Sequence, residues 1–162
     1  MSKTINVALA GAGAFGIKHL DGIRNIDGVK VVSLVSRDLD KTREVADKYG
    51  IGHVTTELAE SLALPGVDAV ILCTPTQMHA AQGIQCLKAG KHVQVEIPLA
   101  DSLKEARAVV DLQRQTGLVA MCGHTRRFNP SHQYVHKKIV AGQFRIQQMD
   151  VQTYFFRRTN MN

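Results

Sequence analysis

Hydrophobic and polar positions alternate in two different ways along this chain. Short runs rich in valine, isoleucine and leucine indicate buried strands, and longer stretches with apolar residues at helical spacing indicate helices. The predicted strands are Thr4–Ala10, Val29–Val35, Asp68–Cys73, His92–Glu96 and Leu118–Cys122. The predicted helices are Phe15–Asn25, Asp40–Tyr49, Glu57–Leu62, Gln77–Ala89, Ser102–Thr116 and Asn129–Ala141.

The order of these elements predicts the fold class. Strands that alternate with helices, and that are apolar on both faces, are typical of a parallel sheet covered on both sides. The prediction is therefore an α/β protein with a doubly wound parallel sheet.

The pattern changes near residue 125, from short buried strands to one long, half-polar segment, Phe144–Phe156. We predict a complete domain over residues 1–124 and the beginning of a second, incomplete α/β domain over residues 125–162. The alternation in Phe144–Phe156 predicts a strand. A strand without its sheet exposes an apolar edge, so we expect dimerisation or aggregation through this segment.

Composition excludes several classes of protein. The chain has 162 residues, of which 44% are hydrophobic, and this is enough for one ordinary domain with a core. It has no run of about 18 apolar residues, so we expect no membrane span. The N-terminal stretch lacks a small-residue cleavage site, which argues against a signal peptide. Three widely spaced cysteines form no disulfide framework and no metal spacing, so we expect reduced thiols and a cytoplasmic protein.

The formal net charge is +6, and the basic residues cluster only near the C-terminal end. Aromatic residues make up 5% of the chain, and no nucleic-acid-binding motif frames the basic clusters, so nucleic acid is the weakest of the readings. A small anionic ligand accounts for the charge, and so does a solvated basic face. The basic clusters are Arg126–Arg127, His136–Lys138 and Arg157–Arg158.

A glycine-rich loop follows the first predicted strand and opens the first predicted helix. Its sequence, GAGAFG at residues 11–16, matches the GxGxxG pattern of dinucleotide-binding loops. Gly11 permits the tight turn, Gly13 lets a pyrophosphate approach the backbone, and Gly16 lets helix and strand pack closely. The helix N-terminus supplies free N–H groups for the phosphates. The loop therefore predicts a Rossmann-type fold that binds a dinucleotide.

The end of the second predicted strand indicates which dinucleotide is bound. Enzymes that prefer NAD usually carry an acidic residue there, which holds the ribose 2′-hydroxyl. This chain has Ser36 and Arg37 about 20 residues beyond Gly16. Arg37 can pair with a 2′-phosphate and Ser36 can donate a hydrogen bond to it, which favours NADP over NAD. Asp38 stands next to them, either as a ribose ligand or as a turn or cap residue.

Four motifs in order resemble the Gfo/Idh/MocA family of nicotinamide-dependent oxidoreductases. They are GAGAFG at 11–16, CTPTQMH at 73–79, AGKHVQVEIPLA at 89–100 and GHTRRFNP at 123–130. The resemblance covers essentially the whole chain. It implies a Rossmann domain followed by an α/β domain whose open sheet often forms the interface of a homo-oligomer and much of the substrate site.

The resemblance also implies which residues bind the cofactor. Thr74, Pro75 and His79 match family residues that lie beside it, and Glu96 matches the glutamate of the family's Glu-Lys-Pro motif. With the glycine loop, the predicted cofactor-binding residues are Gly11, Gly13, Ala14, Phe15, Gly16, Ser36, Arg37, Thr74, Pro75, Thr76, His79 and Glu96.

Ile97 occupies the position where most members of the family have a catalytic lysine. The candidate catalytic residues are therefore Glu96 and His124. Arg126 and Arg127 are the candidate residues for a carboxylate substrate, because they follow the carboxyl end of a strand, where ligands bind in such sheets, and because arginine grips carboxylates in a bidentate way.

Each of these residues also has a structural interpretation. Glu96 can hydrogen-bond a loop, His79 can satisfy backbone groups, and His124 can be a structural histidine. One of the two arginines at 126 and 127 can be a surface charge or an interdomain ion pair. Cys73 and Cys122, in predicted buried strands, are expected in the core.

Two functional readings follow. The first is an NADP-dependent dehydrogenase, and the second is a non-catalytic NADP-binding module or a truncated half of a sugar or polyol dehydrogenase. No metal site is predicted, because His132 and His136, four residues apart on one helix, lack a third ligand nearby. Arg157 and Arg158 can reach a substrate carboxylate or simply flank a strand.

Overall fold

A computed structural model describes residues 4–152 and shows a six-stranded, fully parallel sheet. The strand order is β3-β2-β1-β4-β5-β6, the order of a Rossmann-type sheet. The predicted fold class is therefore confirmed. The strands are β1 (Ile5–Ala10), β2 (Val29–Val35), β3 (His53–Thr55), β4 (Ala69–Leu72), β5 (His92–Val95) and β6 (Ala120–Cys122).

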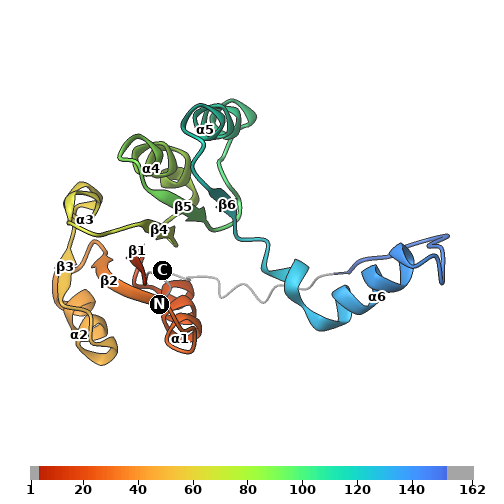
Figure 1. Ribbon diagram of the computed structural model, residues 1–162, viewed down its shortest axis with the longest axis horizontal. Helices are drawn as coiled ribbons and strands as arrows, with labels where there is room; N and C mark the ends of the chain where they lie inside the picture. The colour runs from red at the N-terminus through yellow and green to blue at the C-terminus, as the bar shows by residue number, and fades with distance from the viewer. Residues whose placement is uncertain (1–3, 153–162) are drawn as a thin grey trace, which may run out of the picture. The chain divides into compact units, whose positions relative to one another are not determined.

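Helices cover both faces of this sheet (Figure 1). One buried cluster joins the sheet to α3, α4 and α5, and a second cluster joins it to α1 and α2. The helices of this part of the chain are α1 (Ala14–Ile23), α2 (Leu39–Tyr49), α3 (Leu58–Ala63), α4 (Thr76–Lys88) and α5 (Leu103–Thr116).

The core is built from the alternation of side chains along the strands. In β1, Val7 and Leu9 pack into one cluster, whereas Ala8 and Ala10 pack into the other. Successive residues of a strand point to opposite faces, so a strand buried on both faces must be apolar throughout. This explains why the central strands have continuous apolar sequences.

Local signals in the sequence define the ends of several helices. The Ser102 side chain accepts a hydrogen bond from the Glu105 N–H and donates one to the Glu105 carboxylate, which is the predicted capping box. Gly117 ends the same helix in the left-handed conformation, with φ of 66°.

The cofactor crevice lies where the direction of chain progression across the sheet reverses. β1 lies between β2 and β4, and the loops that leave the carboxyl ends of β1 and β4 turn toward opposite faces. Ligands of open α/β sheets bind at this point, so the fold places the glycine loop where a dinucleotide is expected.

The chain divides into two compact units between His124 and Thr125. In the second unit, a 3-10 helix, η1 (Thr125–Phe128), leads into α6 (Pro130–Val140). The Asn129 side chain caps α6 by accepting from the Ser131 N–H.

One predicted strand is absent over the described residues, and one observed strand was not predicted. Residues 144–152 form no strand, and residues 153–156 lie outside the described part of the chain. The alternating pattern alone cannot form a strand, because a strand needs a neighbour to accept its hydrogen bonds, and the six strands described pair only with one another. The expectation of dimerisation through an edge strand loses its basis in residues 144–152. The short strand β3, which pairs in parallel with β2, was not predicted.

None of the helices within residues 4–152 is long and apolar enough to cross a membrane.

Candidate cofactor and active site

The glycine loop has the geometry that its sequence predicts. Gly11 has a φ of 104°, and a side chain there would collide with the carbonyl oxygen of Cys73 at the end of β4. A side chain on Gly16 would collide with the Gly11 carbonyl oxygen. Around Gly13, by contrast, no atom lies within 4 Å of where a side chain would begin, and this leaves open space at the N-terminus of α1. The three glycines therefore make the turn, the open approach and the close packing that were assigned to them.

A cleft of about 250 Å³ opens in front of this loop. Four loops at the carboxyl edge of the sheet meet around it, those that follow β1, β2, β3 and β4. The cleft brings together six of the predicted cofactor residues, which are Gly11, Gly13, Ser36, Arg37, Thr74 and Pro75. Its lining comprises Gly11, Ala12, Gly13, Val35, Ser36, Arg37, Thr56, Cys73, Thr74, Pro75, Met78 and Gln82.

Ser36 and Arg37 stand at one end of this cleft, and Arg37 is exposed. The neighbouring Asp38 does not line it. The Asp38 carboxylate caps α2, accepts from the Lys41 N–H at 3.2 Å and lies 3.0 Å from Lys41 Nζ. Its hydrogen bonds with Lys41 lower the pKa of this carboxyl group. The structure therefore shows the cap interpretation of Asp38 and leaves a guanidinium as the charge in this part of the cleft.

The remaining residues of the glycine and β4 motifs lie around the cleft rather than in its lining. Ala14 and Thr76 are the first residues of α1 and α4. Phe15 is exposed, with the Lys18 ammonium 5.0 Å from its ring centre. Gly16 is buried beneath the loop.

His79 is buried and joins two loops at the carboxyl edge of the sheet. Its Nδ1 lies 2.7 Å from the Pro98 carbonyl oxygen, and its Nε2 lies 2.7 Å from the Thr74 carbonyl oxygen. Both partners are acceptors, so the ring nitrogen that carries the proton donates to the carbonyl oxygen beside it. His79 thus satisfies backbone groups, as its structural interpretation proposed, and by doing so it holds the cleft loop against the corner after β5.

Glu96 follows β5 and is 8% exposed. Its Oε1 accepts hydrogen bonds from His19 Nε2 at 2.7 Å and from Gln94 Nε2 at 3.3 Å. A side chain on Gly123 would begin only 2.9 Å from the same oxygen. The sequence did not indicate His19 as a site residue, because it lies on α1, 77 positions from its partner. Only its place one turn beyond the glycine loop could have suggested it.

Cys73 lies beside this pair, and its expected place in the core was wrong in part. It follows β4, is only partly buried and lines the cleft, with its Sγ within 4.8 Å of the His19 and Glu96 donor atoms. Burial and, to a lesser extent, the Glu96 charge raise the pKa of this thiol to about 12. Cys73 is therefore a neutral thiol at physiological pH. Cys122 is also partly exposed, at the end of β6.

Ile97, the residue between Glu96 and Pro98, is 49% exposed and adds no titratable group to this corner. The acid–base groups near the end of β5 are therefore Glu96 and His19. His124 is exposed and is the last residue of the first unit.

A separate cleft of about 410 Å³ belongs to the second unit. It is lined by Arg126, Arg127, His132, Gln133 and His136. Nδ1 of His132 lies 3.0 Å from the Arg126 carbonyl oxygen, which ties α6 to the preceding 3-10 helix. The lining is basic and contains no carboxylate, so its chemistry suits an anion rather than a metal ion. Arg157 and Arg158 lie outside the described residues.

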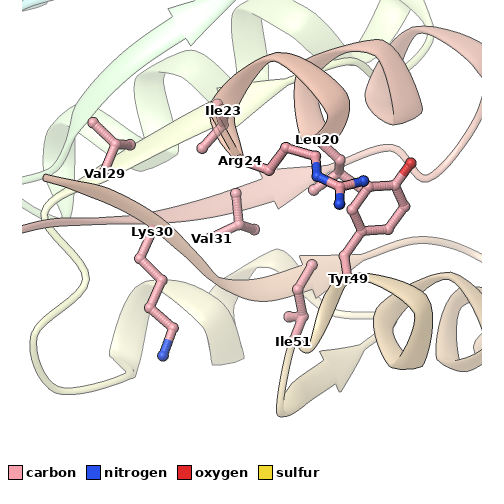
Figure 2. A pocket seen from close by; sticks show the side chains of 8 residues that line it. All are labelled: Leu20, Ile23, Arg24, Val29, Lys30, Val31, Tyr49 and Ile51. Atoms are coloured by element: carbon pink, nitrogen blue, oxygen red, sulfur yellow. The ribbon is translucent and has the colours of Figure 1, made fainter. Parts of the chain in front are cut away.

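A third hollow, of about 130 Å³, lies at the opposite end of β2 (Figure 2). Its side chains come from the end of α1, the first residues of β2 and the end of α2. The Tyr49 hydroxyl at this place donates to the Asp21 carboxylate at 2.7 Å. None of the predicted site residues lines it, and we interpret it as packing space between two helices.

Comparison with known proteins identifies the family of the chain. Residues 5–124 match the Gfo/Idh/MocA profile, described as an oxidoreductase family with an NAD-binding Rossmann fold, and residues 130–162 match the profile of the C-terminal region of bacterial oxidoreductases. The 4-carboxy-2-hydroxymuconate-6-semialdehyde dehydrogenase of Sphingobium sp. strain SYK-6 is 68% identical over 158 residues, which are 98% of this chain and 50% of that protein. The chain therefore spans about half the length of this curated relative.

Two solved structures show the same fold with different cofactors. A scyllo-inositol dehydrogenase from Lactobacillus casei, with bound NAD(H) and scyllo-inositol, superposes with a TM-score of 0.83 and 25% identity, over 87% of this chain and 42% of that one. A 3-ketoreductase from Actinomadura kijaniata in complex with NADP has a TM-score of 0.79 and 26% identity, over 86% of this chain and 44% of that one. The fold thus accommodates either dinucleotide.

Proposed function

Because the chain belongs to the Gfo/Idh/MocA family of oxidoreductases, we propose that it is an NADP-dependent dehydrogenase whose first unit holds the dinucleotide. The observation that carries this proposal is the cleft in which the open side of Gly13 faces the same space as Ser36 and Arg37. The loop can receive a pyrophosphate, and the guanidinium can pair with a 2′-phosphate. Bound NADP would supply the hydride acceptor.

The choice of NADP depends on the end of β2. The relative that binds NAD(H) and the one that binds NADP share this fold, so the fold alone does not decide between them. Asp38 is occupied by the cap of α2, and the remaining polar groups at this end of the cleft are the Ser36 hydroxyl, the Thr56 hydroxyl and the Arg37 guanidinium. These groups suit a phosphate better than a ribose hydroxyl.

For the substrate, we propose 4-carboxy-2-hydroxymuconate-6-semialdehyde, on the basis of the 68% identity to the Sphingobium dehydrogenase of that name. Its hydroxyl group can add to the aldehyde and close a cyclic hemiacetal. Loss of a hydride from the carbinol carbon, with loss of the hydroxyl proton, gives a lactone, 2-pyrone-4,6-dicarboxylate. This reaction belongs to the degradation of protocatechuate by 4,5-cleavage.

The hemiacetal accounts for the isoleucine at position 97. A hemiacetal hydroxyl is more acidic than that of an ordinary alcohol, so it needs a weaker base than a lysine amine. Glu96, held at the end of β5, can accept this proton, and His124 is the second candidate for it.

A product with two carboxylates requires cationic groups at the site. Arg126 and Arg127 line a basic cleft and suit this task, because guanidinium groups bind carboxylates in a bidentate manner. We propose that residues 125–162 begin the substrate and oligomerisation domain, and that the protein works as a homo-oligomer.

The test is an assay for NADPH formation by this chain, with freshly prepared semialdehyde and saturating NADP. Turnover would support the proposed reaction and would show that Ile97 is no defect. Binding of NADP without turnover of this substrate would contradict the dehydrogenase assignment for this chain, and absence of NADP binding would contradict the cofactor assignment as well.

The alternative function is that of an NADP-binding half of a sugar or polyol dehydrogenase. The observation that favours it is the superposition on the scyllo-inositol dehydrogenase from Lactobacillus casei, with a TM-score of 0.83 over 87% of this chain. The same assay with scyllo-inositol in place of the semialdehyde separates the two substrates.

A further inference from the structure

His19 and Glu96 form a side-chain pair that the proposed function does not by itself require. His19 projects from α1 and Glu96 follows β5, and Nε2 and Oε1 are 2.7 Å apart. Both side chains are largely shielded from solvent, with exposures of 20% and 11%. Because this largely shielded contact joins α1 to the residue after β5, it restricts the orientation of both side chains.

Glu96 is held through one of its two oxygens. Within residues 4–152, the hydrogen bonds that its carboxylate accepts both reach Oε1, from His19 and from Gln94. Every fully buried side-chain oxygen in this part of the chain has a hydrogen-bond partner. Since Oε2 accepts no hydrogen bond from the described residues, it is not fully buried and is in contact with solvent. The absence of a side chain on Gly123 leaves room for Oε1, because a Cβ there would lie 2.9 Å from it. Oε2 is therefore the oxygen available to a ligand.

The pair lies directly behind the wall of the cofactor cleft. Cys73 lines that cleft, and its Sγ is within 4.8 Å of His19 Nε2 and of a Glu96 carboxylate oxygen. At this corner Ile97 offers no acid–base group, and Cys73 is a neutral thiol. The proton that leaves the substrate hydroxyl has Glu96 as its acceptor on this side of the cleft.

We propose that His19 is a positioning residue for hydride transfer, an inference that rests on the proposed function. Its Nε2–H donates to Oε1 and so keeps Oε2 directed toward the substrate. The O–H bond of the hemiacetal breaks and its proton goes to Oε2. The C–H bond breaks with its electron pair, which leaves as hydride to NADP, and the carbon–oxygen double bond of the lactone forms.

The test compares three variants in the dehydrogenase assay. We expect His19→Ala to lower kcat/KM by about 10- to 100-fold, less than the roughly 10²- to 10⁴-fold that a positioned proton acceptor contributes, because Glu96 itself remains. His19→Gln should recover most of the rate, since the amide N–H can still donate to Oε1. The matched control is His53→Gln, which should leave kcat/KM unchanged. His53 is a partly buried histidine on β3 whose ring is hydrogen-bonded to the Ser33 hydroxyl on β2.

A second measurement does not depend on turnover. In 15N–1H NMR spectra of the chain, the His19 ring should carry its proton on Nε2, and a proton on Nδ1 alone would overturn the proposal. Equal kcat/KM values for wild type and His19→Ala would also overturn it. So would loss of activity in EDTA with recovery in Zn²⁺, because the same donor atoms would then be metal ligands. If the chain binds NADP without turnover while the Nε2 proton is found, the proposed reaction fails and the His19–Glu96 contact stands.

Discussion

Three consecutive residues at the end of β2 determine which charge faces the ribose of a bound dinucleotide. Arg37 lines the cleft, whereas Asp38 is committed to the first turn of α2 through its contacts with Lys41. The cap and the ion pair with Lys41 hold the Asp38 carboxylate at the start of α2, outside the lining of the cleft. We therefore propose that Arg37, rather than Asp38, faces the ribose.

Substitution of Arg37 tests this assignment. We expect Arg37→Ala to weaken NADP binding by about 10- to 100-fold, because a charge-assisted pair with the 2′-phosphate is lost, and to change NAD binding little. Titration of both dinucleotides by calorimetry measures the effect. Arg43→Ala, on the exposed face of α2, is the control. A parallel loss of affinity for NAD and NADP would contradict a role in 2′-phosphate recognition.

Residue-level prediction from the sequence succeeded where the signal is local. The three glycines and the capping box lie within a few positions of the groups that they serve, so short patterns identify them. The contact between His19 and Glu96 spans 77 positions and exists only because the fold brings α1 and β5 together. No pattern in the sequence carries that information.

The loops at the carboxyl edge of the sheet are joined by side chains from the helices that follow them. His79, in the first turns of α4, contacts the Thr74 carbonyl at the end of β4 and the Pro98 carbonyl after β5. The cleft loop and the corner that carries Glu96 are thus fixed relative to each other. This connection between elements holds the cleft loop and the corner that carries Glu96 together at the carboxyl edge of the sheet.

The stability of this connection can be measured. We expect His79→Leu to lower the free energy of unfolding by about 1–3 kcal/mol, because a partly buried carbonyl group at this corner loses its donor. Urea denaturation followed by circular dichroism gives this value. Gln77→Leu, two positions away and exposed on the same helix, is the control and should have a small effect. Equal midpoints for the two variants would show that the His79 contacts do not stabilise the fold.

Element prediction worked for the helices and for the longer apolar strands, because both have a strong periodic signal. β3 has only three residues, His53–Thr55, and two of them, His53 and Thr55, are polar. It becomes a strand through pairing with β2, which its own sequence does not encode. The segment 144–152 shows the reverse case, since it has an alternating pattern without a paired neighbour.

At the scale of the whole chain, the two units contain different elements. The first contains a sheet covered on both faces, a glycine loop and a cleft, which together are the parts that dinucleotide binding requires. The second, over its described residues, contains a 3-10 helix, α6 and a basic cleft. The first unit therefore contains the parts for binding a dinucleotide, and we propose that the second contributes to substrate binding.

The central claim is that the glycine loop receives the pyrophosphate of NADP, and Gly13 allows a direct test. Its φ is −79°, and its surroundings are empty, so an alanine fits the folded chain without strain. Gly22 on the same helix is equally unobstructed, which makes Gly22→Ala the matched control. Gly22→Ala should melt at or slightly above the wild-type temperature, because alanine lowers the entropy of the unfolded chain. Gly13→Ala should stay folded but melt slightly lower, because alanine is a poorer N-cap of α1 than glycine.

The one measurement to make is therefore a calorimetric titration of NADP into wild type, Gly13→Ala and Gly22→Ala, which gives the three affinities. The new methyl group of Gly13→Ala would occupy the space of the pyrophosphate, and we expect its affinity to fall by about tenfold or more, a loss of about 1.4 kcal/mol or more. Gly22→Ala should bind NADP as the wild type does. Undiminished binding by a folded Gly13→Ala variant would contradict the claim that this loop holds the cofactor.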